Sequence, residues 1–478
     1  MAQPETSPTE DHIDPALKRL TWVLVLGALA PALDTTIVNV ALAAIGSGLH
    51  ASVPTTQWTI TGYLLAAGMA MPVTGWAAGH FGAKRLWLFS LGLFMLGSAL
   101  SGAAWSATSL IVFRLVQGVA AGLMLPMVMT LLVQAAGPKR LGRLMGIATL
   151  PLAVVPIFGP VVGGLIVNNL SWRWIFYVNV PTCILAMLLA WRFVPGSRAP
   201  AQRHRFDLLG LALISPAVAL LIYGLSKASA VGGFSNREAW LPLLTGAVLG
   251  FIFLAYALYK KENAIVNVKV FRTRSYSASV TVFFLAGLSL YGPLLLLALF
   301  YQDVQSKSAL LAGLLLAPQG IGSLLPRTVA GRLTDRAGPR VVVLASLVLT
   351  AVGTLPFAFA GPNTSDWLLA AFLLVRGAGL AGATIAVMAG AFRDVQPKQV
   401  PDASTITRIV QQVGGSFGAS VLAMILAGGL AANNATPAAR ASAFGTAFWW
   451  AVGFTVLALL PALLLPGKMK ARVQAARD

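Results

Sequence analysis

The sequence predicts an all-α polytopic membrane protein that crosses the bilayer about fourteen times. Hydrophobic residues make up 57% of the 478 residues and charged residues only 10%, with a mean hydropathy of +0.80. In a soluble domain about a quarter of the residues are charged. Apolar runs of the roughly 20 residues that a membrane-spanning helix needs recur along almost the whole chain. Because these runs do not alternate with polar residues, they exclude a transmembrane β-barrel.

The apolar runs place each crossing in order. We expect crossings near residues 20–44, 57–78, 86–104, 108–133, 144–168, 174–194, 208–226, 239–259, 276–301, 309–330, 341–360, 367–391, 403–429 and 443–465. Most connections are short, so consecutive helices should be antiparallel neighbours.

Two longer basic linkers, 195–206 and 260–275, enclose a pair of helices that has the character of an insert. The predicted organisation is therefore a disordered tail, a six-helix bundle, linkers with a two-helix insert, a second six-helix bundle and a basic tail, at residues 1–18, 19–194, 195–275, 276–465 and 466–478. The first tail is acidic and lacks a basic start and a small-residue cleavage site, so no cleaved signal is expected.

The formal net charge of +20 reports topology, because Lys and Arg cluster in every second connection. By the positive-inside rule both termini are cytoplasmic, which requires an even number of crossings. This placement favours contact with a lipid bilayer and gives no reason to expect a nucleic-acid partner. The clusters begin at Lys18, Lys84, Lys139, Arg198, Lys260, Arg332, Arg393 and Lys468.

No catalytic or metal-binding constellation is visible, so an enzyme is not expected. The single cysteine, Cys183, lies within an apolar run, which excludes an intramolecular disulfide. The histidines all fall in tails or loops, which argues against a metal site or a His-based hydrolase inside the membrane. No Gly-x-x-x-x-Gly-Lys-Ser/Thr phosphate loop occurs, so neither ATP nor another cofactor is expected. The four histidines are His12, His50, His80 and His204.

Asp34 is the only acidic residue well inside a predicted crossing. Placing a charge at membrane depth costs roughly 2.5 to 3.5 kcal/mol, so such a residue usually faces a water-filled cavity and marks an ion or proton path. Asp34 lies about 21 Å along a helix that begins at Leu20, and about 15 Å from its outer end. Arg114 enters from the outer side and lies about 9 Å deep, which brings the two side chains within reach.

A neighbouring arginine favours an ionised carboxylate, whereas apolar burial favours the protonated form. A change in the position of Arg114 relative to Asp34 would therefore bind and release a proton. The alternative interpretation is a static ion pair that fixes helix packing.

Other polar residues at membrane depth are candidates for a substrate cavity. Arg376 has no acid in its own half, so it can pair with Asp34 across a cavity, bind backbone carbonyls or extend to water. Interhelical hydrogen bonds are the more common use of amides in membranes, and aromatic residues serve in packing as often as in polyspecific pockets. The candidates besides Arg376 are Asn39, Gln117, Tyr291 and Gln319.

Residues 151–164 place three prolines and three glycines in one predicted crossing. Proline removes a backbone hydrogen bond and small residues permit close helix contact, so this helix is either part of a gate or simply tightly packed. The candidate gate residues are Pro156, Gly159, Pro160, Gly163 and Gly164.

A loop motif repeats in the two halves of the chain: Gly75–Arg85 is echoed by Gly331–Arg340, each after the second helix of its bundle. Glycines flanked by cations suit a tight turn near the inner leaflet, and turn structure alone would explain them. Parallel repeats of this kind predict two bundles with the substrate bound between them. The motif residues are Gly75, Gly82, Arg85, Gly331, Asp335, Arg336, Gly338 and Arg340.

These segments together resemble the major facilitator superfamily, and within it the fourteen-helix drug:proton antiporter (multidrug efflux) family. The resemblance implies two six-helix bundles plus two extra helices in the cytoplasmic (inner) membrane, and export of lipophilic, often cationic molecules in exchange for protons. It also implies coupling through Asp34 and Arg114. The matching segments are Leu33–Leu42, Ile111–Gly122, Phe158–Gly164, Trp172–Pro181 and Arg205–Gly210.

One departure from the family concerns the first loop motif, where Gly79 and His80 replace the usual Asp and Arg. The second copy keeps Asp335 and Arg336, so the departure bears on the balance between inward and outward states of the first half.

Two other functions stay open. A symporter or uniporter for one small metabolite would keep the fold and change the coupling. A sensor or scaffold that does not transport would need a sizeable loop or tail for partners, and the sequence shows none; nor does it indicate an obligate protein partner.

Overall fold

The computed structural model describes residues 14–136, 144, 147–148, 155, 159, 162–196, 206–230, 236–307, 309–396, 399–432 and 437–467. Every described element is helical. Within the described part of the chain, ten helical segments are long and apolar enough to cross a membrane. The helices are α1 (Pro15–Gly48), α2 (Val53–Ala70), α3 (Val73–Phe81), α4 (Ala83–Gly102), α5 (Ala107–Ala136), α7 (Trp174–Tyr177), α8 (Asn179–Phe193), α9 (Leu208–Ala230), α10 (Arg237–Lys260), α11 (Arg274–Asp303), α12 (Ala309–Leu324), α13 (Arg327–Ala337), α14 (Pro339–Thr354), α15 (Asp366–Phe392), α16 (Val400–Ala432), α17 (Pro437–Leu457) and α18 (Leu459–Ala462), with short 3₁₀ turns η2 (Lys261–Asn263), η3 (Val268–Arg272) and η4 (Leu355–Ala358).

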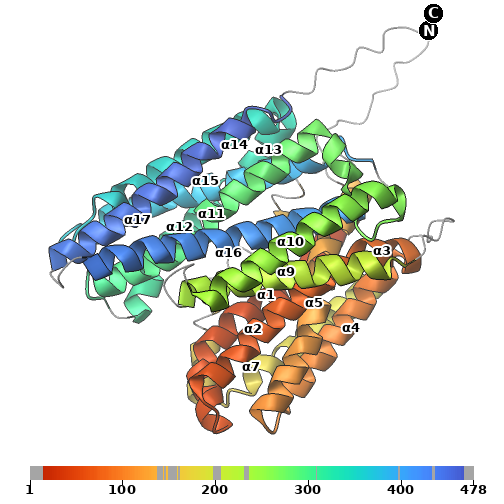
Figure 1. Cartoon of the computed structure of the whole chain (residues 1–478), viewed down its shortest axis with the longest axis horizontal. Helices are drawn as coiled ribbons and strands as arrows, with labels where there is room; N and C mark the ends of the chain where they lie inside the picture. Colours follow the sequence, from red (N-terminus) through yellow and green to blue (C-terminus); the bar gives the residue numbers. More distant parts are fainter. Residues whose placement is uncertain are drawn as a thin grey trace, which may run out of the picture.

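The helices form two groups that meet along one side (Figure 1). Helices α1–α8 make the first group, and α11–α17 make the second. Between them lies the pair α9 and α10, and α9 packs against both α2 of the first group and α16 of the second. Helix α9 therefore bridges the two groups, and α10 packs on α9.

Two predicted crossings, 57–78 and 309–330, are each divided in two. The first becomes α2 and α3, with Pro72 at the junction, and the second becomes α12 and α13, with Pro326 at the junction. Proline has no N–H to continue the helical hydrogen bonds, which explains both breaks. At Pro72 the apolar run continues across the break, so hydropathy alone does not show it, whereas Pro326 is followed by the polar residues of α13, beginning with Arg327.

Glycines allow equivalent helix pairs to pack closely in the two groups. A Cβ at Gly122 of α5 would overlap the backbone oxygen of Ala67 in α2. In the second group, a Cβ at Gly377 of α15 would overlap the backbone oxygen of Gln319 in α12. The contacts α2–α5 and α12–α15 are thus built in the same way, which agrees with the repeat seen in the sequence.

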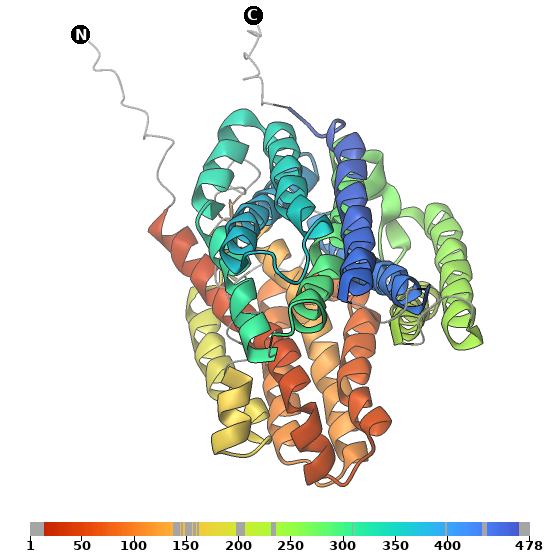
Figure 2. The ribbon, with the colours of Figure 1, turned by 90° about the vertical axis from the view of Figure 1, so that its left-hand side faces the viewer.

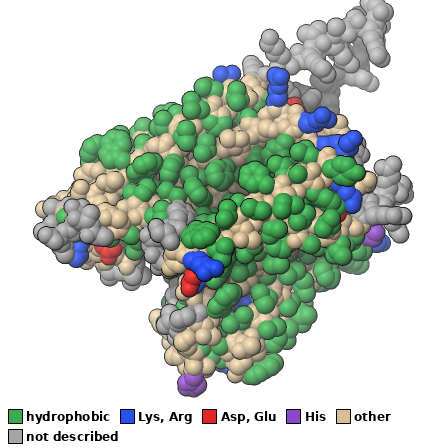
Figure 3. All heavy atoms as spheres, viewed as in Figure 1, with side chains coloured by type: hydrophobic (Ala, Val, Ile, Leu, Met, Phe, Trp, Pro, Cys, Tyr) green, Lys and Arg blue, Asp and Glu red, His purple; other side chains and the backbone are tan. Residues whose placement is uncertain are grey.

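The two groups touch at one end and diverge at the other. The start of α1 and the last described residues lie at the same end of the molecule (Figure 2). We call this end the terminal end. There α3 of the first group packs against α16 of the second. At the opposite, far end the two lobes spread apart (Figure 3). The conformation is therefore closed at the terminal end and open at the far end.

Candidate functional site

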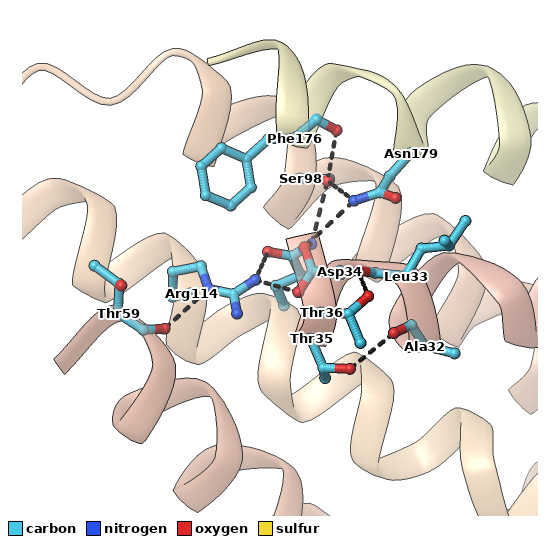
Figure 4. Close-up of polar contacts among 11 residues, drawn as sticks. Ala32, Leu33, Asp34, Thr35, Thr36, Thr59, Ser98, Arg114, Phe176 and Asn179 are labelled. Atoms are coloured by element: carbon cyan, nitrogen blue, oxygen red, sulfur yellow. Dashed lines mark hydrogen bonds and ion pairs between the residues drawn. The ribbon is translucent and has the colours of Figure 1, made fainter. Parts of the chain in front are cut away.

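Four helices of the first group bring a polar cluster together inside the bundle (Figure 4). Asp34 comes from α1, Ser98 from α4, Arg114 and Gln117 from α5, and Asn179 from the first turn of α8. All five side chains are buried, and Asp34 has no exposed surface. Buried polar groups need hydrogen-bond partners, and here these come from the cluster itself and from the backbone oxygens of Thr59 and Phe176.

The Asp34 carboxylate accepts hydrogen bonds from three side chains. Arg114 Nη1 lies 2.5 Å from Oδ2, and Gln117 Nε2 lies 3.0 Å from Oδ1. Asn179 Nδ2 lies 3.3 Å from the same Oδ1. A cation and two amides therefore compensate a charge that would otherwise be very costly here.

Arg114 has further partners that do not depend on Asp34. Its Nη1 also donates to Gln117 Oε1 at 2.8 Å, and its Nε donates to the backbone oxygen of Thr59 at 3.0 Å. The guanidinium carbon lies 4.2 Å from the centre of the Tyr63 ring, a cation–π distance. The arginine would thus stay solvated by the protein if its counterion became neutral.

Ser98 holds the two amides in place. Its hydroxyl accepts from Gln117 Nε2 at 3.1 Å and from Asn179 Nδ2 at 3.0 Å, and it donates to the backbone oxygen of Phe176 at 2.9 Å. Sequence reasoning missed Ser98 and Asn179. Asn179 lies within the Trp172–Pro181 motif, which was a usable signal, whereas a serine in an apolar helix gives none.

The site differs from expectation in one respect. The sequence predicted an acid that faces a water-filled cavity, but Asp34 is enclosed within the first group of helices in this conformation. The reason is that the amide groups of α5 and α8 occupy the space around the carboxylate that water would otherwise fill.

Arg376 occupies a comparable place in the second group, and it too is buried. Its Nη1 donates to Gln319 Oε1, its Nη2 to the backbone oxygen of Ser289 at 3.0 Å, and its Nε to Thr354 Oγ1 at 3.1 Å. None of the described carboxylates forms an ion pair with it. Of the three partners that the sequence allowed for Arg376, the structure therefore shows neutral oxygen atoms and not the Asp34 carboxylate. Gln319 forms an interhelical hydrogen bond with Arg376.

Two glycines of the predicted gate lie against α1 beside Asp34. A Cβ at Gly159 would lie 2.8 Å from Thr36 Cβ, and a Cβ at Gly163 would lie 3.2 Å from Ile37 Cγ2. Gly164 has no neighbour within 4 Å of such a Cβ. Among the other predicted residues, Pro156 and Pro160 lie outside the described residues, and Asn39 and Tyr291 lie in α1 and α11 with side chains that the structure does not describe.

The loop motifs form matching turns in the two groups. Gly82 joins α3 to α4 with φ of 87°, and Gly338 joins α13 to α14 with φ of 88°. Only glycine adopts this backbone region readily, so both positions require it. Of the remaining residues of the motif, Arg85, Arg336 and Arg340 are exposed, Asp335 is half-buried and Gly331 is buried.

The first loop motif also contacts the second group of helices. A Cβ at Gly75 would lie 2.5 Å from Asp402 Oδ1, in the first turn of α16, whereas a Cβ at Gly79 would meet nothing within 4 Å. His80 stacks on Trp76, with ring centres 4.9 Å apart. Of the two glycines, Gly75 is therefore the one that lies against α16.

Metal binding finds no support among the described residues, which contain no group of three His, Cys, Asp or Glu side chains able to hold an ion. The one cysteine, Cys183, is buried and free.

Comparison with known proteins places this architecture in a family. A model described as the Major Facilitator Superfamily matches residues 24–419 and 282–476. The "Multidrug resistance protein B homolog" of Mycobacterium tuberculosis (strain ATCC 25618 / H37Rv) is 35% identical over 416 residues, covering 87% of this chain and 77% of that protein. The "Multidrug export protein EmrB" of Escherichia coli (strain K12) is 29% identical over 403 residues, covering 84% and 78%.

Solved structures share the fold at low sequence identity. The human organic anion transporter MFSD10 superimposes with a TM-score of 0.68 at 14% identity, over 94% of this chain and 100% of that one. The proton:xylose symporter XylE bound to 6-bromo-6-deoxy-D-glucose gives 0.62 at 15% identity, over 93% and 94%. Since the family model and the relatives cover most of the sequence, this chain belongs to the major facilitator superfamily and is a transporter, not an enzyme.

Proposed function

We propose that the protein is a proton-coupled antiporter that exports lipophilic small molecules, cations among them, by alternating access. The observation that carries this proposal is the enclosure of Asp34, at membrane depth, by Arg114 and two amides. A carboxylate in such a place is costly unless it serves an ion or proton path. The names of the relatives, which refer to multidrug resistance and export, support the substrate class.

The site contains partners for both charge states of Asp34. When the carboxyl is ionised, it pairs with Arg114. When it is protonated, Gln117 and Asn179 can still donate to its carbonyl oxygen, while Arg114 keeps Gln117, the Thr59 carbonyl and the Tyr63 ring. The arginine and the two amides therefore keep hydrogen-bond or cation–π partners in both states, which lowers the cost of moving between them.

Movement of the two groups would decide which side reaches Asp34. With fourteen crossings and cytoplasmic termini, the open far end faces outside. Closing that end and opening the α3–α16 contact would expose the site to the cytoplasm. Gly159 and Gly163, which lie against α1 beside Asp34, would transmit the movement. The proton gradient across the cytoplasmic membrane is then the only energy source, with no cofactor and no obligate protein partner.

The test compares Asp34→Asn with the wild type in proteoliposomes that have an imposed pH gradient. Asparagine is isosteric with a neutral carboxylic acid but cannot exchange a proton. We expect gradient-driven ethidium efflux to fall to the rate without a gradient, while exchange of ethidium without a gradient continues. Efflux that still follows the gradient in this variant would remove Asp34 from the coupling.

A further inference from the structure

A cavity of about 150 Å³ lies between the first group of helices and the inserted helix α9. Helix α1 contributes one residue, α2 contributes four and α9 contributes three. The cavity is distinct from the Asp34 cluster, with which it shares no residue. Its lining residues are Leu42, Gln57, Ile60, Thr61, Leu64, Ile222, Tyr223 and Ser226.

The lining is apolar at the base and polar at the mouth. Ile222 is buried, and Leu42, Ile60 and Leu64 are half-buried, whereas Gln57 and Ser226 are exposed. No lining residue carries a charge. A volume near 150 Å³ with apolar walls accepts one aromatic ring.

Two hydroxyl groups of the lining are available to a ligand. Thr61 and Ser226 have no hydrogen-bond partner among the described residues. Elsewhere on α2, Thr56 and Thr59 donate to the backbone oxygens of Ser52 and Thr56, at 3.0 and 2.7 Å. The hydroxyls of Thr61 and Ser226 can therefore bond to a ligand, whereas those of Thr56 and Thr59 already donate to the backbone of their own helix.

An aromatic wall completes the cavity. The Tyr223 ring stacks on Trp58, with centres 6.2 Å apart and planes 24° from parallel. Lys227 Nζ lies 5.8 Å from the same ring and is neutralised by Glu238 at 3.1 Å. The cavity therefore presents an ordered aromatic face without a free charge, which favours an uncharged ring over an ion.

Helix α9 connects this cavity to both groups of helices. Ser215 Oγ donates to the backbone oxygen of Met69 in α2 at 2.7 Å. Ser420 Oγ of α16 donates to the backbone oxygen of Leu225 in α9 at 2.6 Å. Since Leu225 precedes Ser226, this hydrogen bond ties the wall of the cavity to the second group. The shape of the cavity therefore depends on the position of the two groups relative to each other.

We propose that this cavity is a second binding site, for an uncharged ring-sized aromatic group that carries a hydrogen-bonding substituent. The ring would lie between Leu42, Leu64 and Ile222, and its polar substituent would reach Thr61 and Ser226. The role of the site in transport rests on the proposed export function, but the binding itself does not require a gradient. The ligand could be part of an exported molecule or a free aromatic compound.

The experiment measures protection of an engineered thiol in purified full-length protein. In a Cys183→Ala background, Ser226→Cys places a thiol at the mouth of the cavity. The control, Leu241→Cys, places a thiol in the second turn of α10, at a residue that does not line the cavity. Each variant reacts with N-ethylmaleimide in detergent and in lipid nanodiscs, with and without indole. No pH gradient is used, so failure here would leave the Asp34 proposal intact.

Indole at ten times its dissociation constant should slow labelling of Ser226→Cys by about tenfold and leave Leu241→Cys unchanged. Adding Thr61→Leu, which fills the cavity, should restore the labelling rate. Equal slowing of both thiols would mean that indole only partitions into the apolar phase, and unchanged labelling of Ser226→Cys would mean that nothing binds. Slow labelling in nanodiscs without indole would mean that a lipid chain fills the cavity. Each of these three results would overturn the proposal.

Discussion

Two buried arginines, Arg114 and Arg376, show what a single residue contributes to the proposed coupling. Arg114 faces a carboxylate, and Arg376 binds neutral oxygens in the described part of the chain. Of these two arginines, only Arg114 therefore has an ion-pair energy that changes when Asp34 gains or loses a proton. In this conformation Arg376 ties helices α11, α12 and α14 to α15.

Replacing each arginine by glutamine separates these roles. Arg114→Gln removes the cation that favours ionised Asp34, so gradient-driven efflux should fall to background. Arg376→Gln should keep the dependence on the gradient but lower stability, because a buried oxygen that loses its donor costs about 1–3 kcal/mol. Efflux assays and thermal unfolding of the two purified variants would check both statements. Gradient-dependent efflux by Arg114→Gln, or its loss in Arg376→Gln, would reverse the assignment.

Part of the site could be predicted from single residues. The helical rise placed Asp34 and Arg114 within side-chain reach of each other, and the structure joins them. Asn179 was harder to foresee because its role depends on the direction of α8. Ser98 carries no signal, since a serine in an apolar helix normally bonds to its own backbone.

At the scale of elements, close contacts between helices place α1 in the site. Gly159 and Gly163 approach α1 at Thr36 and Ile37, which lie within one turn of Asp34. The sequence predicted a tightly packed crossing here from its prolines and glycines, but it did not show which helix the glycines meet. That partner depends on the tertiary arrangement.

The glycine pair Gly159 and Gly164 tests whether this contact matters. Gly159→Ala would push the backbone at residue 159 away from Thr36 of α1, whereas Gly164→Ala adds a methyl group where the structure has open space. Gly159→Ala should lower gradient-driven efflux at least several-fold and lower the melting temperature, and Gly164→Ala should do neither. Equal behaviour of the two variants in these assays would show that the contact is unimportant.

A second glycine pair tests the contact that closes the terminal end. Gly75→Ala places a Cβ 2.5 Å from Asp402 Oδ1, and Gly79→Ala, on the same helix, meets nothing within 4 Å. Gly75→Ala should therefore shift the population toward states open at the terminal end, and the double variant with Asp402→Ala should reverse the shift. Distances between spin labels across the terminal end of α3 and α16 would measure it. A shift with Gly79→Ala, or none with Gly75→Ala, would contradict this view of the closure.

At the scale of the whole molecule, the sequence predicted the all-helical membrane architecture because composition and run length report burial in lipid directly. The internal repeat also indicated two comparable halves. The division of two crossings at Pro72 and Pro326 was missed, and at Pro72 the reason is that the apolar run continues across the break. The position of α9 and α10 could not be read from the sequence either, because the contacts of α9 with α2 and α16 depend on surfaces far apart in the chain.

The proposed cycle makes one requirement of the whole transporter: binding of substrate must be coupled to release of a proton from Asp34. The most direct measurement is proton release when ethidium binds to purified protein in weakly buffered solution, followed with a pH-indicator dye. The wild type should release protons on binding, and Asp34→Asn should bind ethidium without releasing any. Proton release that persists unchanged in Asp34→Asn would contradict the account, because some other group would then carry the exchanged proton.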